Sequence, residues 1–180
     1  MLAVTAGVAG SALAGCLGES DAESESEKPA SGDLGDPAAH VDVEVMSIPR
    51  PDVDPTIVHI EPGGTVEWIG QGQRNAVVAY HPETYTYQRI PDDADPWQSP
   101  MLREGDRFEV TLDSEGVYDY ADPTTFCSTH EAAGAVGRIV VGWPDPDAEP
   151  ALQHDPAELP SRAGTVLKAC NERCREMLGD

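Results

Sequence analysis

The chain of 180 residues is long enough for one domain with a single hydrophobic core and short tails. It carries 33 Asp and Glu residues against 11 Lys and Arg residues, so its formal net charge is -22. That charge repels nucleic acid phosphates and anionic lipid head groups, which excludes both as direct partners. Because concentrated salt screens the repulsion between carboxylates, the composition predicts a halophilic source, with an acidic docking surface as the alternative.

The N-terminus has the pattern of a targeting segment. Residues 2–15 are small and apolar, too few to span a bilayer comfortably, and end in Leu13-Ala14-Gly15-Cys16. This tetrapeptide matches a lipobox, so residues 1–16 are predicted to be a lipoprotein signal segment with Cys16 as the lipidated residue. The charged region that normally precedes the apolar run is missing, and we therefore expect the true start to lie upstream. An ordinary apolar helix is the alternative.

Residues 17–40 are rich in Glu, Asp, Ser, Ala, Gly and Pro and contain almost no large apolar side chain. Such a segment cannot bury enough surface to offset its conformational entropy, so we expect a disordered acidic linker. A flexible chain of this length would hold the next domain a few nanometres from a membrane.

Residues 41–143 show a β pattern, with short apolar runs separated by Pro and Gly. Val41–Val45 and Thr65–Ile69 alternate apolar and polar residues with the period of two that is typical of strands. Further strands are expected at Thr56–Ile60, Asn75–Tyr80, Arg107–Leu112, Gly116–Tyr120 and Arg138–Val141. This spacing favours an all-β Greek-key sandwich, with residues 82–101 as a long loop across one end.

Two metal-binding residue types lie close together near the end of this region. Tyr118-Asp119-Tyr120 is followed by Cys127-Ser-Thr-His130-Glu-Ala-Ala-Gly134, and Arg138-Ile-Val-Val-Gly142 closes the last strand. A thiolate and an imidazole on one loop can reach the same soft metal ion. With Tyr80-His81-Pro82 and Arg89-Ile90-Pro91 upstream, the motif resembles the ligand loop of the cupredoxins, in particular the halocyanin-like branch of the plastocyanin-type proteins.

The resemblance implies a cupredoxin-like sandwich with a type 1 copper site, in which Cys127 and His130 are two of the ligands. The family's weak axial Met falls at Ala135, whose methyl group cannot coordinate. Its second imidazole falls at Asn75, whose amide oxygen suits copper poorly. His81 is the other candidate imidazole, but six extended residues separate it from Asn75, about 20 Å along a strand.

The loop is also longer than the family pattern by five residues, which lie within the stretch 121–126. These residues could loop out and leave Cys127 in place, or they could displace it, and the turn signal Asp122-Pro123 favours the looped-out insertion. Without a metal, Cys127 would be a buried thiol and His130 a capping or surface imidazole. His59, in an earlier strand with apolar neighbours, is expected to be structural.

The C-terminal part is predicted to be a linker over residues 144–159 and a helix over residues 160–180. Apolar and thiol side chains recur there at three- and four-residue steps, so the helix should pack against the sandwich: Val166, Leu167, Cys170, Cys174, Met177 and Leu178. Cys170 and Cys174 share one face, where ordinary packing and a joint Cu(I) site are the two interpretations. Parallel side chains oppose a mutual disulfide.

These features together predict a monomeric, membrane-tethered electron carrier of the halocyanin type, lipid-anchored on the extracytoplasmic face of the cell membrane. A redox protein would be its partner and copper its cofactor. The alternative is a cupredoxin-fold lipoprotein that has lost redox copper and acts as a binding or structural module, or delivers copper. No nucleophile motif and no paired-carboxylate signature is present in the sequence, so an enzyme is not expected.

Overall fold

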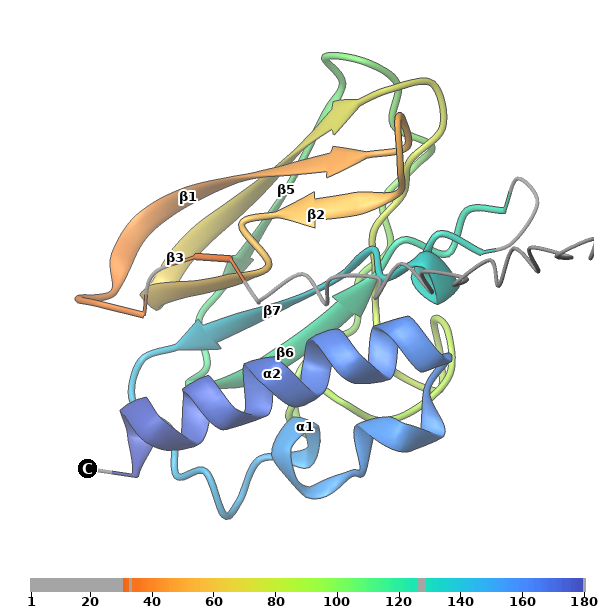
Figure 1. The fold of residues 1–180 in the computed structure, drawn as a ribbon. Coiled ribbons are helices and arrows are strands. Elements are labelled where there is room, and N and C mark those ends of the chain that lie inside the picture. The colour runs from red at the N-terminus through yellow and green to blue at the C-terminus, as the bar shows by residue number, and fades with distance from the viewer. Residues whose placement is uncertain (1–30, 33, 126–128, 180) are drawn as a thin grey trace, which may run out of the picture.

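The computed structural model describes residues 31, 32, 34–125 and 129–179 (Figure 1). The predicted signal segment with Cys16, most of the predicted acidic linker, and Cys127 lie outside these residues. The elements are β1 (Ala38–Met46), β2 (Asp52–Asp54), β3 (Ile57–Gln71), β4 (Val78–Ala79), β5 (Arg107–Leu112), β6 (Gly116–Ala121), the 3-10 helix η1 (Glu131–Ala133), β7 (Val136–Val141), α1 (Pro150–Gln153), the 3-10 helix η2 (Pro156–Glu158) and α2 (Ser161–Leu178).

The strands form two packed layers, and β3 takes part in both (Figure 1). Its second half pairs with β1 in parallel and with β5 in antiparallel fashion, whereas Ile57–Ile60 pairs in parallel with β7. The sandwich predicted from the sequence is therefore confirmed. The difference is that the runs at 56–60 and 65–69, expected as two strands, belong to one strand that bends at Gly63, whose positive φ of 82° favours glycine.

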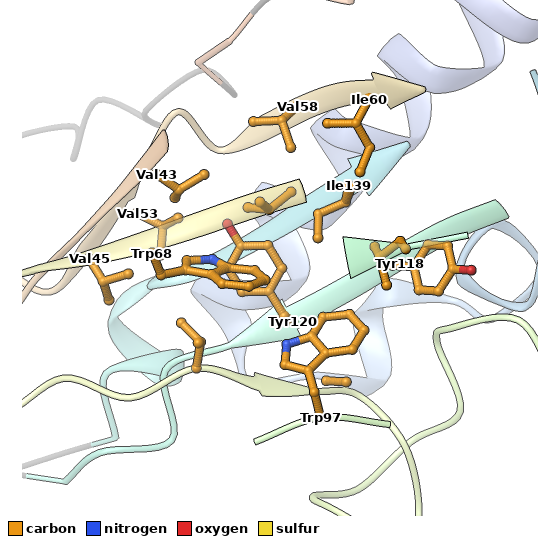
Figure 2. Close-up of a cluster of buried hydrophobic side chains, with 14 of the residues drawn as sticks. Val43, Val45, Val53, Val58, Ile60, Trp68, Trp97, Tyr118, Tyr120 and Ile139 are labelled. Atoms are coloured by element: carbon orange, nitrogen blue, oxygen red, sulfur yellow. The ribbon is translucent and has the colours of Figure 1, made fainter. Parts of the chain in front are cut away.

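The buried strand β6 sends alternate side chains into two cores, as the period of two requires. Tyr118 and Tyr120 enter the core between the layers, where the rings of Tyr120 and Trp68 meet edge to face at 5.1 Å (Figure 2). A Cβ at position 137 would lie 2.3 Å from the Tyr120 hydroxyl, so only glycine allows this packing. Val117 faces the other way, toward the helices.

Helix α2 lies along the outer face of β6 and β7 and covers the second core (Figure 1). Leu167, Cys170 and Cys174 are fully buried there, which confirms the predicted apolar stripe. Residues 144–159, expected as a linker, carry α1 and η2 and bury Leu152 against the same core. Within the part of the chain that the structure describes, no helix combines the length and the apolar composition of a membrane span.

A buried ionic cluster joins the long loop, the sheet and α1. Asp119 on β6 accepts from the Nε atoms of Arg89 and Arg138, at 2.9 and 2.7 Å. Arg89 also donates to the carbonyl oxygens of Ala151 and His154, and all three charged side chains are at most 1% exposed. These contacts hold residues 82–101 onto the sheet.

The strand predicted at 75–80 is shorter in the structure and consists of β4 alone. On one side, its backbone bonds to residues of the long loop and of the segment after it, and not to a neighbouring strand. The N–H of Ala79 donates to the carbonyl of Trp97, and Asn75 and Leu102 exchange both backbone hydrogen bonds. Asn75 is thereby fixed at the end of the sandwich at which β6 runs into the loop that carries His130.

Candidate metal centre

The candidate site lies in the loop between β6 and β7, and backbone hydrogen bonds close this loop at its base. The N–H of Asp122 donates to the carbonyl of Ala135 at 2.9 Å, and that of His130 donates to the carbonyl of Thr124 at 2.8 Å. Thr125 and Thr129 pair as an isolated antiparallel bridge. Cys127, the predicted thiolate ligand, falls between these two threonines, in residues 126–128, which the structure does not describe.

The carboxylate of Asp122 organises the loop from inside the protein. It is 0% exposed, and its Oδ1 accepts from the N–H of Ala76 at 3.3 Å, from the N–H of Thr124 at 2.8 Å and from the Thr124 hydroxyl. Its Oδ2 lies 2.8 Å from Nδ1 of His130, which is 5% exposed. Because an ionised carboxylate only accepts, the His130 ring donates through Nδ1 and keeps Nε2 for another partner.

Asn75 is fully buried, and neither its side-chain oxygen nor its side-chain nitrogen has a hydrogen-bond partner among the residues that the structure describes. Leaving such a group unpaired costs about 1–3 kcal/mol, so an unpaired amide at this depth marks a place where a ligand would be stabilising. Asn75 precedes Ala76, whose N–H binds Asp122, and Asp122 in turn binds His130. One carboxylate therefore bridges the two chain segments that carry Asn75 and His130.

Ala135 and His81, the two other predicted positions, have different surroundings. Ala135 is 0% exposed and donates its N–H to the carbonyl of His130, so it lies beside the loop but contributes no donor side chain. His81 lies in a turn, where its Nδ1 accepts the N–H of Glu83 at 3.2 Å. Among the described residues, no hydrogen bond or ion pair joins His81 to Asn75, Asp122 or His130, so no such contact brings this imidazole to the candidate site.

His59 has a structural role. Its Nδ1 and Nε2 lie 2.7 and 2.8 Å from the carbonyl oxygens of Gly35 and Gly142, and its ring meets Trp143 edge to face. Both nitrogens are thus occupied. Within residues 31–125 and 129–179, apart from position 33, no group of three His, Cys, Asp or Glu side chains could hold a metal ion.

The architecture matches two solved structures of pseudoazurin. The protein from Methylobacterium extorquens AM1 superposes with a TM-score of 0.59 over 74% of this chain and 98% of that chain, at 20% identity. The protein from Hyphomicrobium denitrificans gives a TM-score of 0.56 over 74% of this chain and 97% of that chain, at 18% identity. The chain has the cupredoxin fold. No family model matches the sequence.

On the cupredoxin fold, the residues that the sequence resemblance assigns to copper would form a reduced donor set. His130 is oriented by a carboxylate, which is how metal-binding imidazoles are commonly held, and Asn75 has an unpaired buried oxygen. Together with a Cys127 thiolate, these would be one sulfur, one nitrogen and one oxygen donor. A soft ion prefers nitrogen to an amide oxygen, so this set predicts weaker binding than one thiolate with two imidazoles.

Cys170 and Cys174, the two thiols on α2, are poorly suited to bind a metal ion. Cys170 is 0% exposed, and burial raises its pKa to about 12; burial also raises the pKa of Cys174. Arg138 opposes both shifts and donates through Nη1 to the Cys174 sulfur at 3.6 Å. Since the thiolate is the form that binds metal, these contacts favour packing over a Cu(I) site.

Glu131 follows His130 in the candidate loop, and the sequence analysis did not predict a role for it. Its carboxylate is 4% exposed and accepts from the hydroxyls of Tyr80 and Tyr85, each at 2.6 Å. Burial and the Glu131 charge raise the pKa of Tyr80 well above its ordinary value, so this hydroxyl stays a donor. The contact ties the Tyr80-His81-Pro82 turn to the loop. The only sequence signal for Glu131 is its position next to His130. That position does not predict that its carboxylate binds the hydroxyls of Tyr80 and Tyr85.

Proposed function

We propose that this protein is a copper-binding electron carrier built on the cupredoxin fold. Cys127 and His130 would be the principal ligands, and the Asn75 amide oxygen would be a weaker third donor. The observation that carries the proposal is the buried His130, held by Asp122 beside the Cys127 loop and next to the segment of the unpaired Asn75. A copper ion there would supply a one-electron redox couple.

Each residue would contribute a separate part of this function. The Cys127 thiolate would provide the strongest soft donor, and His130 would provide a nitrogen whose orientation is fixed without the metal. The buried rings of Trp68 and Tyr120, in the core that Ala135 joins, would exclude water from the inner side of the site. Ala135 has a methyl group where the family has a Met, so this position would offer copper no sulfur, which would alter the redox potential more than the affinity.

The halocyanin-like and lipid-anchored character is part of this proposal. Its support is the lipobox ending in Cys16, the acidic stretch that follows, and a net charge of -22 that suits high salt. In this proposal the domain works as a monomer at the extracytoplasmic face of a halophile's membrane and exchanges electrons with a redox protein. It performs no catalysis of its own.

A second candidate is a cupredoxin-fold module without redox copper. It is favoured by the hydrogen bonds of Asp122, which accepts from the N–H of Thr124 and binds Nδ1 of His130, so the loop has its polar contacts without a metal. Titrating the purified protein with copper separates the candidates. An intense thiolate-to-copper absorption supports the carrier, tight colourless Cu(I) binding supports copper delivery, and the absence of binding supports the module.

A further inference from the structure

We propose that the N-terminal tether leaves the folded domain toward the end at which β6 runs into the candidate loop, so that this loop end faces the membrane and docks a membrane-bound redox protein. The identity of the partner rests on the proposed function and on the predicted lipid at Cys16. The direction of the tether rests on contacts of residues 31, 32 and 34–36. These residues form a strap at the end of the segment expected to be a linker.

The strap is bound both to the sandwich and to α2. The N–H of Ile57 donates to the carbonyl oxygen of Ser31 at 3.0 Å, and the N–H of Thr56 donates to the Ser31 hydroxyl at 3.1 Å. From α2, Nη2 of Arg173 donates to the carbonyl oxygen of Gly32 at 2.6 Å. A Cβ at Gly32 would lie 2.0 Å from the Ile57 carbonyl oxygen, so only glycine allows the strap to dock.

The strap points toward the loop end when it is followed toward the N-terminus. The first part of β3 runs away from that end, because it pairs in parallel with β7, which begins just after Ala135 and leads away from the loop (Figure 1). Ser31 contacts Ile57, the first residue of β3. Gly35 lies farther along, where its carbonyl oxygen is 2.7 Å from Nδ1 of His59. The strap therefore runs beside β3 in the same direction, and the chain that precedes Ser31 leaves toward the loop end.

The predicted tether is short compared with the domain. Residues 17–30 separate Cys16 from Ser31. A flexible chain of about 15 residues has a root-mean-square span of roughly 20 Å. A folded domain of about 150 residues has a radius of gyration of about 15 Å and is thus roughly 40 Å across. A lipid at Cys16 would therefore hold the exit point of the strap, and with it the loop end, close to the membrane.

The surface of the loop end is partly apolar and cationic, although the whole chain is acidic. Its exposed side chains include two apolar residues and three arginines: Ile48, Met101, Arg50, Arg74 and Arg103. Arg74 and Arg103 flank the bridge between Asn75 and Leu102, and residues 47–51 join β1 to β2 at the same end. Among the described residues these three arginines form no ion pair, although Glu104 lines a shallow pocket with Arg74 and Arg103.

This surface fits a protein whose docking face has an apolar centre and carboxylates around it. It does not fit anionic lipid, because the net charge of -22 opposes contact with a negative membrane surface. The inferred occupant is therefore a membrane-bound protein and not the bilayer itself.

The orientation is tested by energy transfer from the lipidated, metal-free protein to an acceptor-labelled lipid in phosphatidylcholine vesicles. In a Cys127→Ser background, a donor dye is attached at Gln73→Cys, an exposed position at the loop end, or at Glu61→Cys, an exposed position at the opposite end, after the first part of β3. We expect greater transfer from position 73 than from position 61. Equal transfer, or greater transfer from position 61, would overturn the orientation.

Two variants test whether the strap sets this orientation. Gly32→Val prevents docking of the strap, and Arg173→Ala removes its contact with α2, so both should reduce the difference between the two dye positions. The matched control is Arg175→Ala, which loses a bond from α2 to the carbonyl oxygen of Leu152 and should leave the difference unchanged. An unchanged difference in both strap variants, or binding of the unlipidated Cys16→Ser protein to the vesicles, would reject the strap as the cause.

The partner is tested with copper-loaded protein and soluble cytochrome c. One electron passes between the copper and the haem iron, and we expect this exchange to be slower for the vesicle-bound wild type than for vesicle-bound Gly32→Val, because the membrane covers the loop end only in the wild type. Equal rates would reject a membrane-bound partner. Failure of the wild type to bind copper would reject the proposed function and this partner with it, while energy transfer in the metal-free protein would still decide the orientation.

Discussion

Oδ2 of Asp122 lies 2.8 Å from Nδ1 of His130, and their side chains are only 0% and 6% exposed. A buried carboxylate of this kind is stabilising only while its donors remain in place. The loop that would hold copper therefore has an internal polar centre of its own. The stability of the metal-free protein should depend on that centre.

Replacing Asp122 with Ala removes the acceptor for two backbone N–H groups, a hydroxyl and the His130 ring. We expect the free energy of unfolding of the metal-free protein to fall by about 3–5 kcal/mol, as when one partner of a buried ionic contact is lost. Urea denaturation measures this change. Asp155→Ala, at an exposed position with a similar backbone contact, should cost about 1 kcal/mol. Equal losses in both variants would show that the Asp122 network is no more stabilising than a surface turn.

A second prediction concerns the cluster around Asp119. Asp119→Asn leaves the buried guanidinium groups of Arg89 and Arg138 without their carboxylate, so we expect a loss of about 3–5 kcal/mol in unfolding free energy. The ion pair of Arg107 with Glu67 is the control: the Arg107 side chain is 57% exposed, so Arg107→Gln should cost less than about 1 kcal/mol. A small effect at Asp119 would mean that the long loop is held mainly by its apolar contacts.

The helix thiols should be unreactive in the folded protein. Because burial raises the pKa of Cys170 to about 12, almost none of it is thiolate at pH 8, and reactivity would increase only as the pH approaches that value. In a Cys16→Ser, Cys127→Ala variant, a thiol reagent should therefore label neither Cys170 nor Cys174 until denaturant is added. Rapid labelling of the folded variant at pH 8 would contradict the packing role and would favour a metal site at Cys170 and Cys174.

The two altered ligand positions give a gain-of-function prediction. Asn75→His would supply the second imidazole and should raise copper affinity and blue absorption more than Ala135→Met, because equatorial ligands dominate affinity. Ala135 is fully buried, so the larger side chain should also cost about 1–3 kcal/mol of stability. Optical and paramagnetic resonance spectra of the single and double variants test this order. A wild type that already shows a normal blue spectrum would mean that another residue provides the second imidazole.

Membrane attachment has its own test. Cys16→Ser should shift the protein from the membrane fraction to the soluble fraction, because the lipid acceptor is removed. Ser11→Ala, inside the predicted signal segment, is the control and should leave the distribution unchanged. Continued membrane association of the Cys16→Ser protein would reject the lipid anchor.

The sequence predicts those parts of the structure that depend on local pattern. Period-two alternation predicts the sandwich, and the three- and four-residue steps predict the buried face of α2. The likeness to the cupredoxin loop also indicates that Asn75, His130 and Ala135 lie at one end of the fold. These three positions are connected through backbone and Asp122 contacts in the structure.

The sequence does not predict the partners of the buried charges. Asp122 next to Pro123 is typical of a turn, and nothing local shows that its carboxylate meets an N–H from position 76. Asp119 pairs with Arg89 and Arg138 only because strand register and the long loop place them together. Likewise, β3 continues through a Pro-Gly-Gly sequence that resembles a turn, because each half has a neighbouring strand to pair with.

The measurement that tests the central claim most directly is copper titration of the purified wild type, Cys127→Ala, and the Cys170→Ala, Cys174→Ala double variant, followed by absorption spectroscopy and metal analysis. The account predicts one copper per wild-type chain with thiolate-to-copper absorption, no stoichiometric copper in Cys127→Ala, and unchanged binding in the helix double variant. Stoichiometric copper in Cys127→Ala, or its loss in the helix double variant, would contradict a copper centre in the β6–β7 loop.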